Sequence, residues 1–346
     1  MAAKARIGIT KSFYDKSGKS IFPGLETIFE PLPNTEHEVM AEFLPEVTPQ
    51  QIKGFDFVVT RAVPKWTKVS VAGNTQLLSL HRSGVGYDGI DVPGLSDANV
   101  LVFITPDAVR RTVAVGIVTF ILALSNRLLN KDKLTREGRW EERSKYYGTG
   151  LVGKTLGSIG VGNIGHEVFM LAKPFGMKHI ACDPYISQEA VDDVGVKLVD
   201  MDTVLTQSDF LSISVPLSAK THHLVGEKEL RKMKKTAFLI NTARGPIVDE
   251  AALIRALKER WIEGAGIDVF DQEPTPPDNP LLRLDNVIVT PHAIGLTEEF
   301  FAATFREIGT QIASIIKGEL PRGAVNRQVW DKPEFQTKLK EFLARR

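Results

Sequence analysis

Three short segments of the chain carry side chains that suit proton transfer and the binding of a carboxylate. They are Asn241-Thr-Ala-Arg244-Gly-Pro, Asp268-Val-Phe-Asp-Gln-Glu273-Pro and Thr290-Pro-His292-Ala-Ile-Gly295. A histidine exchanges a proton near neutral pH, and a carboxylate bonded to its second ring nitrogen fixes the tautomer and stabilises the imidazolium. An arginine can hold a carboxylate through two parallel hydrogen bonds. Arg244, Glu273 and His292 are therefore the candidate catalytic residues, with His292 as the acid or base.

Each of these residues also has a structural interpretation when it is taken alone. His292 could be a hydrogen-bonded histidine at a strand end, Glu273 an acid of a surface loop, and Arg244 a turn residue before Gly245. Their order along the chain, together with a glycine motif upstream, favours one shared site over three separate structural roles.

The three segments follow short apolar runs that alternate with helical patterns. This alternation predicts parallel sheets with crossover helices, in which ligands bind beyond the carboxyl ends of the strands. Long helices are expected at 107–127 and 299–316, and the apolar stretch 113–124 is too short to span a membrane. Strands are expected at 6–10, 55–60, 77–80, 100–104, 155–160, 179–182, 210–215, 237–241, 264–269 and 286–290.

The glycine motif is Gly160-Val-Gly162-Asn163-Ile164-Gly165, which follows the expected strand 155–160 and precedes a helical run. Gly160 allows a tight turn, Gly162 lets the backbone approach a pyrophosphate, and Gly165 lets the helix pack closely against the strand. The phosphates then lie on the free N–H groups at the start of the helix. The motif alone is weak evidence for a nucleotide, so its context has to decide.

The acid that follows the next expected strand supplies this context. Asp183 comes 23 residues after Gly160, close to the interval of about 20 at which an acid meets the adenosine ribose hydroxyls. Its carboxylate would repel a 2′-phosphate, and neither Pro184 nor Tyr185 offers a cation, so NAD is expected rather than NADP. Asp183 could instead be a turn residue before proline.

The composition is that of a globular protein of two domains without a charge bias. The chain has 346 residues, with 43 basic against 42 acidic side chains. This balance indicates neither a nucleic acid nor a membrane surface as a partner. The single cysteine, Cys182, excludes an intrachain disulfide, and the adjacent His222 and His223 cannot converge on a metal from a regular element, so no metal is expected. Because the start of the chain has no signal-peptide pattern, we expect a cytoplasmic protein.

From about residue 55 to 327, the ordered motifs resemble those of the D-isomer-specific 2-hydroxyacid dehydrogenases, which include phosphoglycerate, glyoxylate/hydroxypyruvate and D-lactate dehydrogenases. The resemblance implies an α/β fold of two Rossmann-like doubly wound parallel-sheet domains with a cleft between them. It also implies NAD-dependent interconversion of a small D-2-hydroxy acid and its 2-oxo acid by a homodimer. We expect a discontinuous substrate domain, residues 1–105 and 299–346, and an NAD-binding domain, residues 106–298.

The resemblance also assigns roles by position. Arg244 would bind the substrate carboxylate, Glu273 would orient His292, and His292 would face the substrate as the acid or base. Asp268 would hold the nicotinamide carboxamide. The remaining cofactor-binding positions are Gly160, Gly162, Asn163, Ile164, Gly165, Asp183, Val215, Pro216, Thr221, Thr242, Ala243 and Gly295.

Further substrate-binding residues are expected in the first domain. Ser83-Gly84-Val85-Gly86 resembles the loop whose amides cradle the substrate carboxylate, and Arg61 matches an arginine that faces the distal anion in related phosphoglycerate enzymes. His81 and Arg82 could add charge beside this loop. We therefore expect a substrate of the phosphoglycerate or the hydroxypyruvate/glyoxylate type.

A second class of function is compatible with the same fold and cofactor. A corepressor-like protein can bind NAD and act through contacts with partners instead of catalysis. A formate-type dehydrogenase, in contrast, would pair its histidine with glutamine, whereas this chain has Glu273. Oxidation of NADH in the presence of 2-oxo acids separates an enzyme from a corepressor. Few residues follow Asn326, so no additional regulatory domain is expected.

Overall fold

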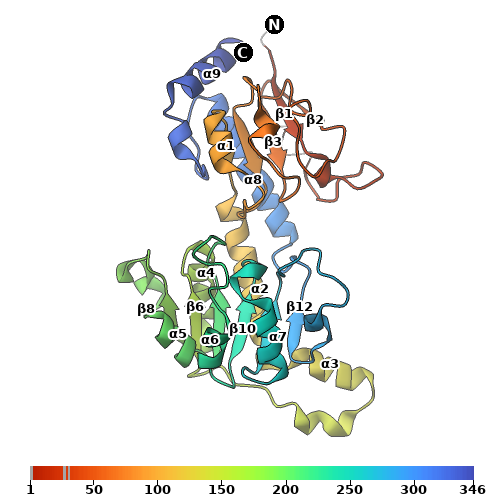
Figure 1. Cartoon of the computed structure of the whole chain (residues 1–346), viewed down its shortest axis with the longest axis vertical. Coiled ribbons are helices and arrows are strands. Elements are labelled where there is room, and N and C mark those ends of the chain that lie inside the picture. Colours follow the sequence, from red (N-terminus) through yellow and green to blue (C-terminus); the bar gives the residue numbers. More distant parts are fainter. Residues whose placement is uncertain (1–2, 26–28, 30–31) are drawn as a thin grey trace. The chain divides into compact units, whose positions relative to one another are not determined.

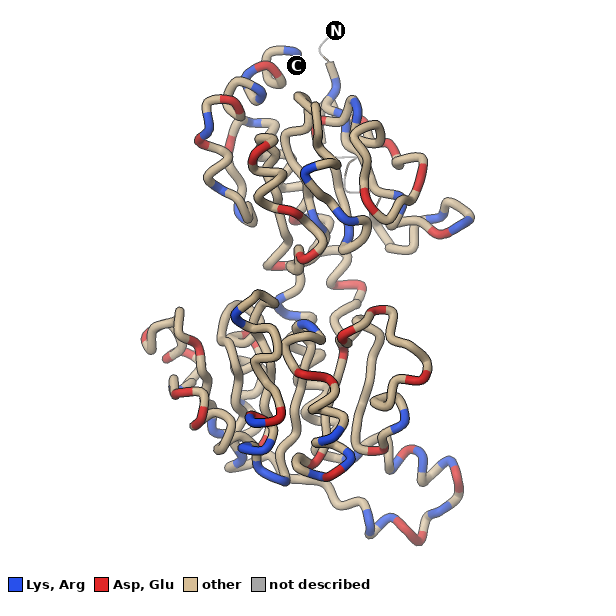
Figure 2. The backbone as a smooth tube through the Cα atoms, in the orientation of Figure 1, with Lys and Arg blue, Asp and Glu red and all other residues tan. Residues whose placement is uncertain are grey.

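The computed structural model describes residues 3–25, 29 and 32–346. The chain divides into two compact units. Unit 1 consists of Met1–Val109 and Thr297–Arg346, and unit 2 consists of Arg110–Leu296. Each unit contains one parallel sheet with helices on both of its faces (Figure 1). Acidic and basic residues are interspersed along the backbone of both units (Figure 2).

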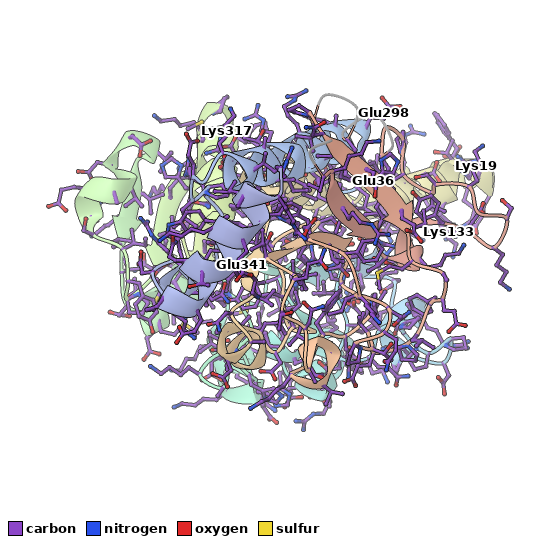
Figure 3. All side chains as sticks on the ribbon, turned by 90° about the horizontal axis from the view of Figure 1, so that it is seen from above. Lys19, Glu36, Lys133, Glu298, Lys317 and Glu341 are labelled. Atoms are coloured by element: carbon purple, nitrogen blue, oxygen red, sulfur yellow. The ribbon has the colours of Figure 1, made fainter. Side chains whose placement is uncertain are left out.

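Unit 1 has a five-stranded parallel sheet in the order β2-β1-β3-β4-β5. Alternate residues of its strands point to opposite faces, so one face packs on α8 and α9 and the other on α1. Lys317, after α8, and Glu341, on α9, are exposed (Figure 3). The elements are β1 (Ala5–Ile9), β2 (Thr35–Val39), β3 (Phe57–Thr60), β4 (Ser79–Arg82), β5 (Leu101–Phe103), α1 (Val92–Asp97), α8 (Glu298–Ile316) and α9 (Pro333–Ala344).

Unit 2 has a seven-stranded parallel sheet in the order β12-β11-β10-β9-β6-β7-β8. One face packs on α5, α6 and α7, and the other on α2 and α4. The strands are β6 (Thr155–Ile159), β7 (Lys178–Cys182), β8 (Val196–Leu198), β9 (Phe210–Ile213), β10 (Phe238–Asn241), β11 (Gly264–Ile267) and β12 (Val287–Val289). The helices are α2 (Pro106–Ser125), which begins in unit 1, α3 (Leu128–Arg136), α4 (Asn163–Ala172), α5 (Met201–Gln207), α6 (Glu227–Lys232) and α7 (Glu250–Lys258).

Helix α2 is longer than the apolar stretch 113–124 that the sequence indicates. It has 20 residues and contains an 18-residue window with a mean hydropathy of 1.7, so it meets the length and composition of a membrane span, the one such helix in the described part of the chain. Ile117, Phe120 and Leu124 pack against the sheet of unit 2, and 61% of the apolar window is buried. Burial against the sheet therefore accounts for the apolar composition of α2.

The predicted α/β class with two parallel sheets is confirmed. Every strand expected from the sequence overlaps an observed strand, and both long helices begin within one residue of the expected position. Two edge strands were not predicted. These are β2, which is exposed at three of its five positions and has charged or polar side chains at four, and β8, which has three residues.

Candidate active site

The glycine motif connects β6 to α4, and each glycine has a distinct steric reason to be there. Gly160 has a φ of +88°, and a Cβ on it would lie 2.5 Å from the carbonyl oxygen of Ser214. A Cβ on Gly165 would lie 2.8 Å from the carbonyl oxygen of Gly160. A Cβ on Gly162 would meet nothing within 4 Å. The turn and the helix packing therefore require Gly160 and Gly165, whereas Gly162 leaves room for a ligand to approach the backbone.

The start of α4 fits a pyrophosphate. Gly162 is the N-cap of this helix and offers no side-chain cap to its first amides. The N–H groups of the first helical turn cannot bond within the helix, so they are donors for a phosphate placed above Gly162. Asn163 and Ile164 contribute two of these backbone groups.

Asp183 follows β7 directly and binds the glycine loop. Its Oδ2 accepts a hydrogen bond from Val161 N at 3.0 Å, and its Oδ1 accepts one from Tyr185 N at 2.9 Å. Gly160 N donates to Cys182 O at 2.9 Å. The carboxylate therefore organises the turn locally. Since each carboxylate oxygen can accept a second hydrogen bond, this local role is compatible with binding a ribose.

Glu273 and His292 form a hydrogen-bonded pair. Nδ1 of His292 lies 2.7 Å from Oε2 of Glu273, and Oε1 of Glu273 accepts a bond from Phe270 N at 3.0 Å. Burial raises the pKa of Glu273, but the hydrogen bond and charge of His292, together with the charge of Arg244, outweigh burial and hold the pKa below its ordinary value. Glu273 is therefore ionised at neutral pH and orients the ring, which leaves Nε2 for proton exchange.

The backbone at His292 has a φ of +53°, in the left-handed region that non-glycine residues seldom adopt. Asp268 holds this conformation. His292 N donates to Asp268 O at 2.7 Å. Oδ1 of Asp268 accepts bonds from Thr290 Oγ1 at 2.5 Å, Ala293 N at 2.8 Å and Ile294 N at 3.1 Å.

Asp268 is buried, and its burial raises the pKa of its carboxyl group against the opposing effect of these hydrogen bonds. Within the described residues, Oδ1 carries every hydrogen bond of this carboxyl group, and Oδ2 has no bonded partner. Asp268 thus positions the loop of His292 with one oxygen and has the other available for a ligand.

Arg244 comes from the loop after β10, and its guanidinium charge lowers the pKa of Glu273 less than the hydrogen bond and charge of His292 do. Asn241 brackets the loop, because its Nδ2 donates to Arg244 O at 3.0 Å and its Oδ1 accepts from Ala243 N at 3.1 Å. Nη1 of Arg244 donates to Ala243 O at 2.6 Å. A Cβ on Gly245 would lie 2.0 Å from the carbonyl carbon of Phe270. This close backbone approach brings the Arg244 loop against the loop that carries Glu273.

The remaining predicted cofactor positions lie in the same unit, after β9, β10 and β12. Thr221 Oγ1 donates to Pro216 O at 2.6 Å and closes the turn that follows Val215. Thr242 and Ala243 follow β10. A Cβ on Gly295 would lie 2.7 Å from Val113 Cγ2, so this glycine allows its loop to pack against α2.

The loop Ser83–Gly86 lies in unit 1, after β4, and two of its amides are engaged within that unit. Ser83 N donates to Thr60 O at 2.9 Å, and Gly84 N donates to Thr105 Oγ1 at 2.7 Å. Among the described residues, no acceptor bonds the amides of Val85 and Gly86. Of the four backbone amides of this loop, those of Val85 and Gly86 are thus the ones that could donate to a substrate carboxylate.

The expectation that His81 adds charge beside this loop was wrong. His81 is fully buried, bonded to Ser79 Oγ at 2.8 Å and to Gln311 Oε1 at 2.9 Å, and stacked on Phe103. Burial lowers the pKa of His81 to about 4, so the ring is neutral at physiological pH. Its role is to bond β4 to α8.

Arg61, after β3, is held within unit 1 by two contacts. Nη1 donates to Ser12 O at 2.9 Å, and the guanidinium lies 4.6 Å from the ring centroid of Phe22. Burial lowers the pKa of Arg61. The side chain is therefore oriented in advance by the loop that follows β1.

The expectation that the adjacent His222 and His223 lie on a regular helix or strand was also wrong. His222 and His223 lie in a turn, not on a regular element, and their ring centroids stack 4.0 Å apart.

Sequence reasoning missed several residues that position the site. Gly245, Thr290 and Thr105 each support a predicted residue through contacts between segments distant in sequence. Gly245 follows Arg244 directly, which was an available signal. Thr105 and Thr290 gave none beyond their places at strand ends.

Comparisons with known proteins identify the family of the chain. The family model described as "D-isomer specific 2-hydroxyacid dehydrogenase, NAD binding domain" matches residues 118–293. The chain is 40% identical over 292 residues to a D-3-phosphoglycerate dehydrogenase of Methanocaldococcus jannaschii, which covers 84% of this chain and 55% of that protein. The chain thus spans little more than half of that relative. A glyoxylate reductase of Korarchaeum cryptofilum is 40% identical, over 71% of this chain and 75% of that protein.

A solved structure gives the same result. The D-lactate dehydrogenase of Aquifex aeolicus, complexed with NAD and lactic acid, has a TM-score of 0.79 and 27% identity, covering 90% of this chain and 96% of that chain. None of these findings supports the corepressor-like alternative. The chain therefore belongs to the D-isomer specific 2-hydroxyacid dehydrogenases, which are NAD-dependent oxidoreductases acting on CH–OH donors.

Proposed function

We propose that the chain reduces a small 2-oxo acid to its D-2-hydroxy acid, and catalyses the reverse reaction, with Arg244, Glu273 and His292 as the catalytic residues. Residues 106–298 form the NAD-binding domain in this proposal, and residues 1–105 with 299–346 form the substrate domain. The observation that carries the proposal is the 2.7 Å bond between His292 and Glu273 in the unit that also holds the dinucleotide loop.

Each residue has a distinct role in the proposed reduction of the 2-oxo acid. The bound NADH supplies the hydride. Arg244 binds the substrate carboxylate and orients the adjacent carbonyl group. Nε2 of protonated His292 donates its proton to the carbonyl oxygen as hydride arrives at the carbon, which yields the alcohol. Glu273 keeps the ring in place through Nδ1 and stabilises its charged form before the transfer.

For the cofactor we propose that the carboxylate of Asp183 binds the ribose hydroxyls and selects NAD over NADP. The first amides of α4 would bind the pyrophosphate, and Oδ2 of Asp268 would receive the carboxamide. The open space above Gly162 and the absence of a side-chain cap on α4 support this placement.

For the substrate we propose an acid of the phosphoglycerate or the hydroxypyruvate/glyoxylate type, and within these types one with a second polar or anionic group, such as phosphoglycerate or hydroxypyruvate. The amides of Val85 and Gly86 would add donors for the carboxylate, and Arg61 would face the distal group. The fixed orientation of Arg61 on Ser12 and Phe22 supports a binding role, because less side-chain freedom is lost when a ligand binds.

A panel of 2-oxo acids tests the proposal. The purified protein is mixed with NADH and with glyoxylate, hydroxypyruvate, pyruvate or 2-oxoglutarate, and phosphoglycerate with NAD is tested in the reverse direction. We expect oxidation of NADH with at least one acid, and Arg61→Ala to lower kcat/KM at least about tenfold for the best substrate. Binding of NADH without turnover of any acid would support the corepressor-like function instead.

We further propose a cytoplasmic homodimer that associates through unit 2. The segment from α3 to residue 152 exposes large apolar side chains on a stretch rich in ion pairs, which supports an interface. These side chains are Leu128, Leu129, Trp140, Tyr147 and Val152. Sedimentation of the protein as a monomer of 38.2 kDa at micromolar concentration would exclude the dimer.

A further inference from the structure

The loop that carries Glu273 has no helix or strand of its own from Asp271 to Asn279, so other contacts must fix its position. Glu273 is bonded at its own end of the loop by Phe270 N. One hydrogen bond from each end of this segment goes to the same carboxylate, that of Glu250 on α7.

Glu250 is the first residue of α7 and reaches both ends of the loop. Its Oε2 accepts a hydrogen bond from Asp271 N at 3.1 Å, and its Oε1 accepts one from Asn279 Nδ2 at 2.8 Å. Two consecutive backbone amides therefore donate to two different carboxylates, Phe270 N to Glu273 and Asp271 N to Glu250. Hydrogen bonds to an ionised acceptor are about twice as strong as neutral ones.

Glu250 is not needed to cap its own helix. Asp249 is the N-cap of α7, and its side chain accepts the bond from Ala252 N at 3.0 Å. The start of α7 favours a negative charge on Glu250. The negative charge of Glu250 also acts on Asp271, whose pKa is raised by burial first and by this charge second. The carboxylates of Glu250 and Asp271 are thus close enough to interact at the start of the loop.

Asn279 connects Glu250 to the far end of the loop through its side-chain hydrogen bonds. This buried side chain donates to Thr275 Oγ1 at 3.1 Å as well as to Glu250, and its Oδ1 accepts from Leu281 N at 2.9 Å. Gly245 also lies against the backbone of Phe270 at the start of the loop. The loop is therefore held between the Arg244 loop and α7.

We propose that Glu250 is a positioning residue for the acid–base pair, holding the segment Asp271–Asn279 so that Glu273 meets His292. The proposal rests on the proposed role of Glu273. It predicts that Glu250 acts through Glu273, and not through the general stability of unit 2.

A double-mutant cycle tests this prediction with NADH and the 2-oxo acid of the panel that is reduced fastest. We expect Glu250→Ala to lower kcat about 10- to 100-fold, as displacement of a catalytic group by up to an ångström does, with the dissociation constant of NADH unchanged within about threefold. In the Glu273→Gln background the same change should lower kcat less than about threefold, because the two residues act in one unit. Glu250→Gln should recover part of the loss, since it keeps one acceptor oxygen.

Glu227→Ala is the matched control, because Glu227 is the first residue of the neighbouring helix α6 and bonds to Arg231 and Arg255 instead of the loop. It should leave kcat within about twofold. If Glu250→Ala does not fold, Glu250→Gln decides, and full activity of that variant with an unchanged pH profile of kcat overturns the proposal. Equal losses from Glu250→Ala with and without Glu273 also overturn it. Full activity of Glu273→Gln would instead overturn the proposed catalytic role.

Discussion

Replacement of Gly245 by alanine should separate the Arg244 loop from the Glu273 loop. A Cβ at this position would lie 2.0 Å from the carbonyl carbon and 2.1 Å from the carbonyl oxygen of Phe270, and 2.5 Å from Asp271 N. All three are backbone atoms, so no flexible side chain can move aside. Since Cβ contacts below 3.0 Å essentially never occur, the two loops must part by about 1 Å.

This displacement sets the expected magnitudes. A misplacement of about 1 Å between catalytic groups costs about 10²-fold in rate, so kcat for reduction of the best 2-oxo acid should fall by that factor. Overpacking of this kind costs about 1–3 kcal/mol, which lowers the melting temperature by several degrees. NADH binding, which depends on the glycine loop of α4, should weaken less than kcat falls.

Steady-state kinetics, NADH fluorescence titration and thermal unfolding measure these three quantities. Gly150→Ala is the control, because a Cβ there meets nothing within 4 Å and the glycine is in the same unit. Wild-type kcat together with a wild-type melting temperature for Gly245→Ala would show that backbone contact does not hold the two loops together.

Three further predictions follow from individual side chains. Burial raises the pKa of Glu307 to about 7, so ionisation of Glu307 destabilises the fold increasingly as pH rises from about 4.5 towards 7 and fully above it. Glu307→Gln keeps an acceptor for Ala108 N and should therefore increase the free energy of unfolding at pH 8 by on the order of 1 kcal/mol, after allowance for partial exposure, which raises the melting temperature. At pH 4 the melting temperature should not change. A larger gain at pH 4 than at pH 8 would contradict this prediction. Arg244→Lys should lower kcat/KM for the 2-oxo acid about 10- to 100-fold, because the ammonium cannot hold the carboxylate at two points, and equal kcat/KM would exclude such binding. Asp183→Asn should raise the ratio of kcat/KM for NADPH to that for NADH at least about tenfold, and an unchanged ratio would remove Asp183 as the selector of NAD.

The hydrophobic pattern predicted the central strands well and the edges poorly. Strand β9 (Phe210–Ile213) is buried along its whole length, and its run of Phe, Leu and Ile, interrupted only by the small Ser212, predicts it directly. Strand β2 (Thr35–Val39) exposes the side chains of Glu36, His37 and Glu38, and its pairing with β1 comes from backbone bonds that leave no apolar pattern. An edge strand of this kind is invisible to a search for buried runs.

For the candidate site, the residue types could be predicted from the sequence, whereas the contacts between distant segments could not. The types and order of Arg244, Glu273 and His292 predict a shared site, because the chemistry requires those side chains at strand ends. The charge state of His81 could not be predicted, since it follows from burial of the ring in a core completed by α8, whose Gln311 is 230 residues away in sequence. The bonds from Glu250 to both ends of the Glu273 loop depend on backbone positions that only the folded chain specifies.

Single-turnover reduction by the His292→Ala variant tests the central claim most directly. The wild type and the variant are loaded with NADH and mixed with the best 2-oxo acid, and the decay of NADH absorbance is followed. His37→Ala, at an exposed edge-strand position in unit 1, is the control. We expect a rate lower by about 10²–10⁴ for His292→Ala, with NADH bound as tightly as in the wild type. Turnover at the wild-type rate in that variant would contradict this claim.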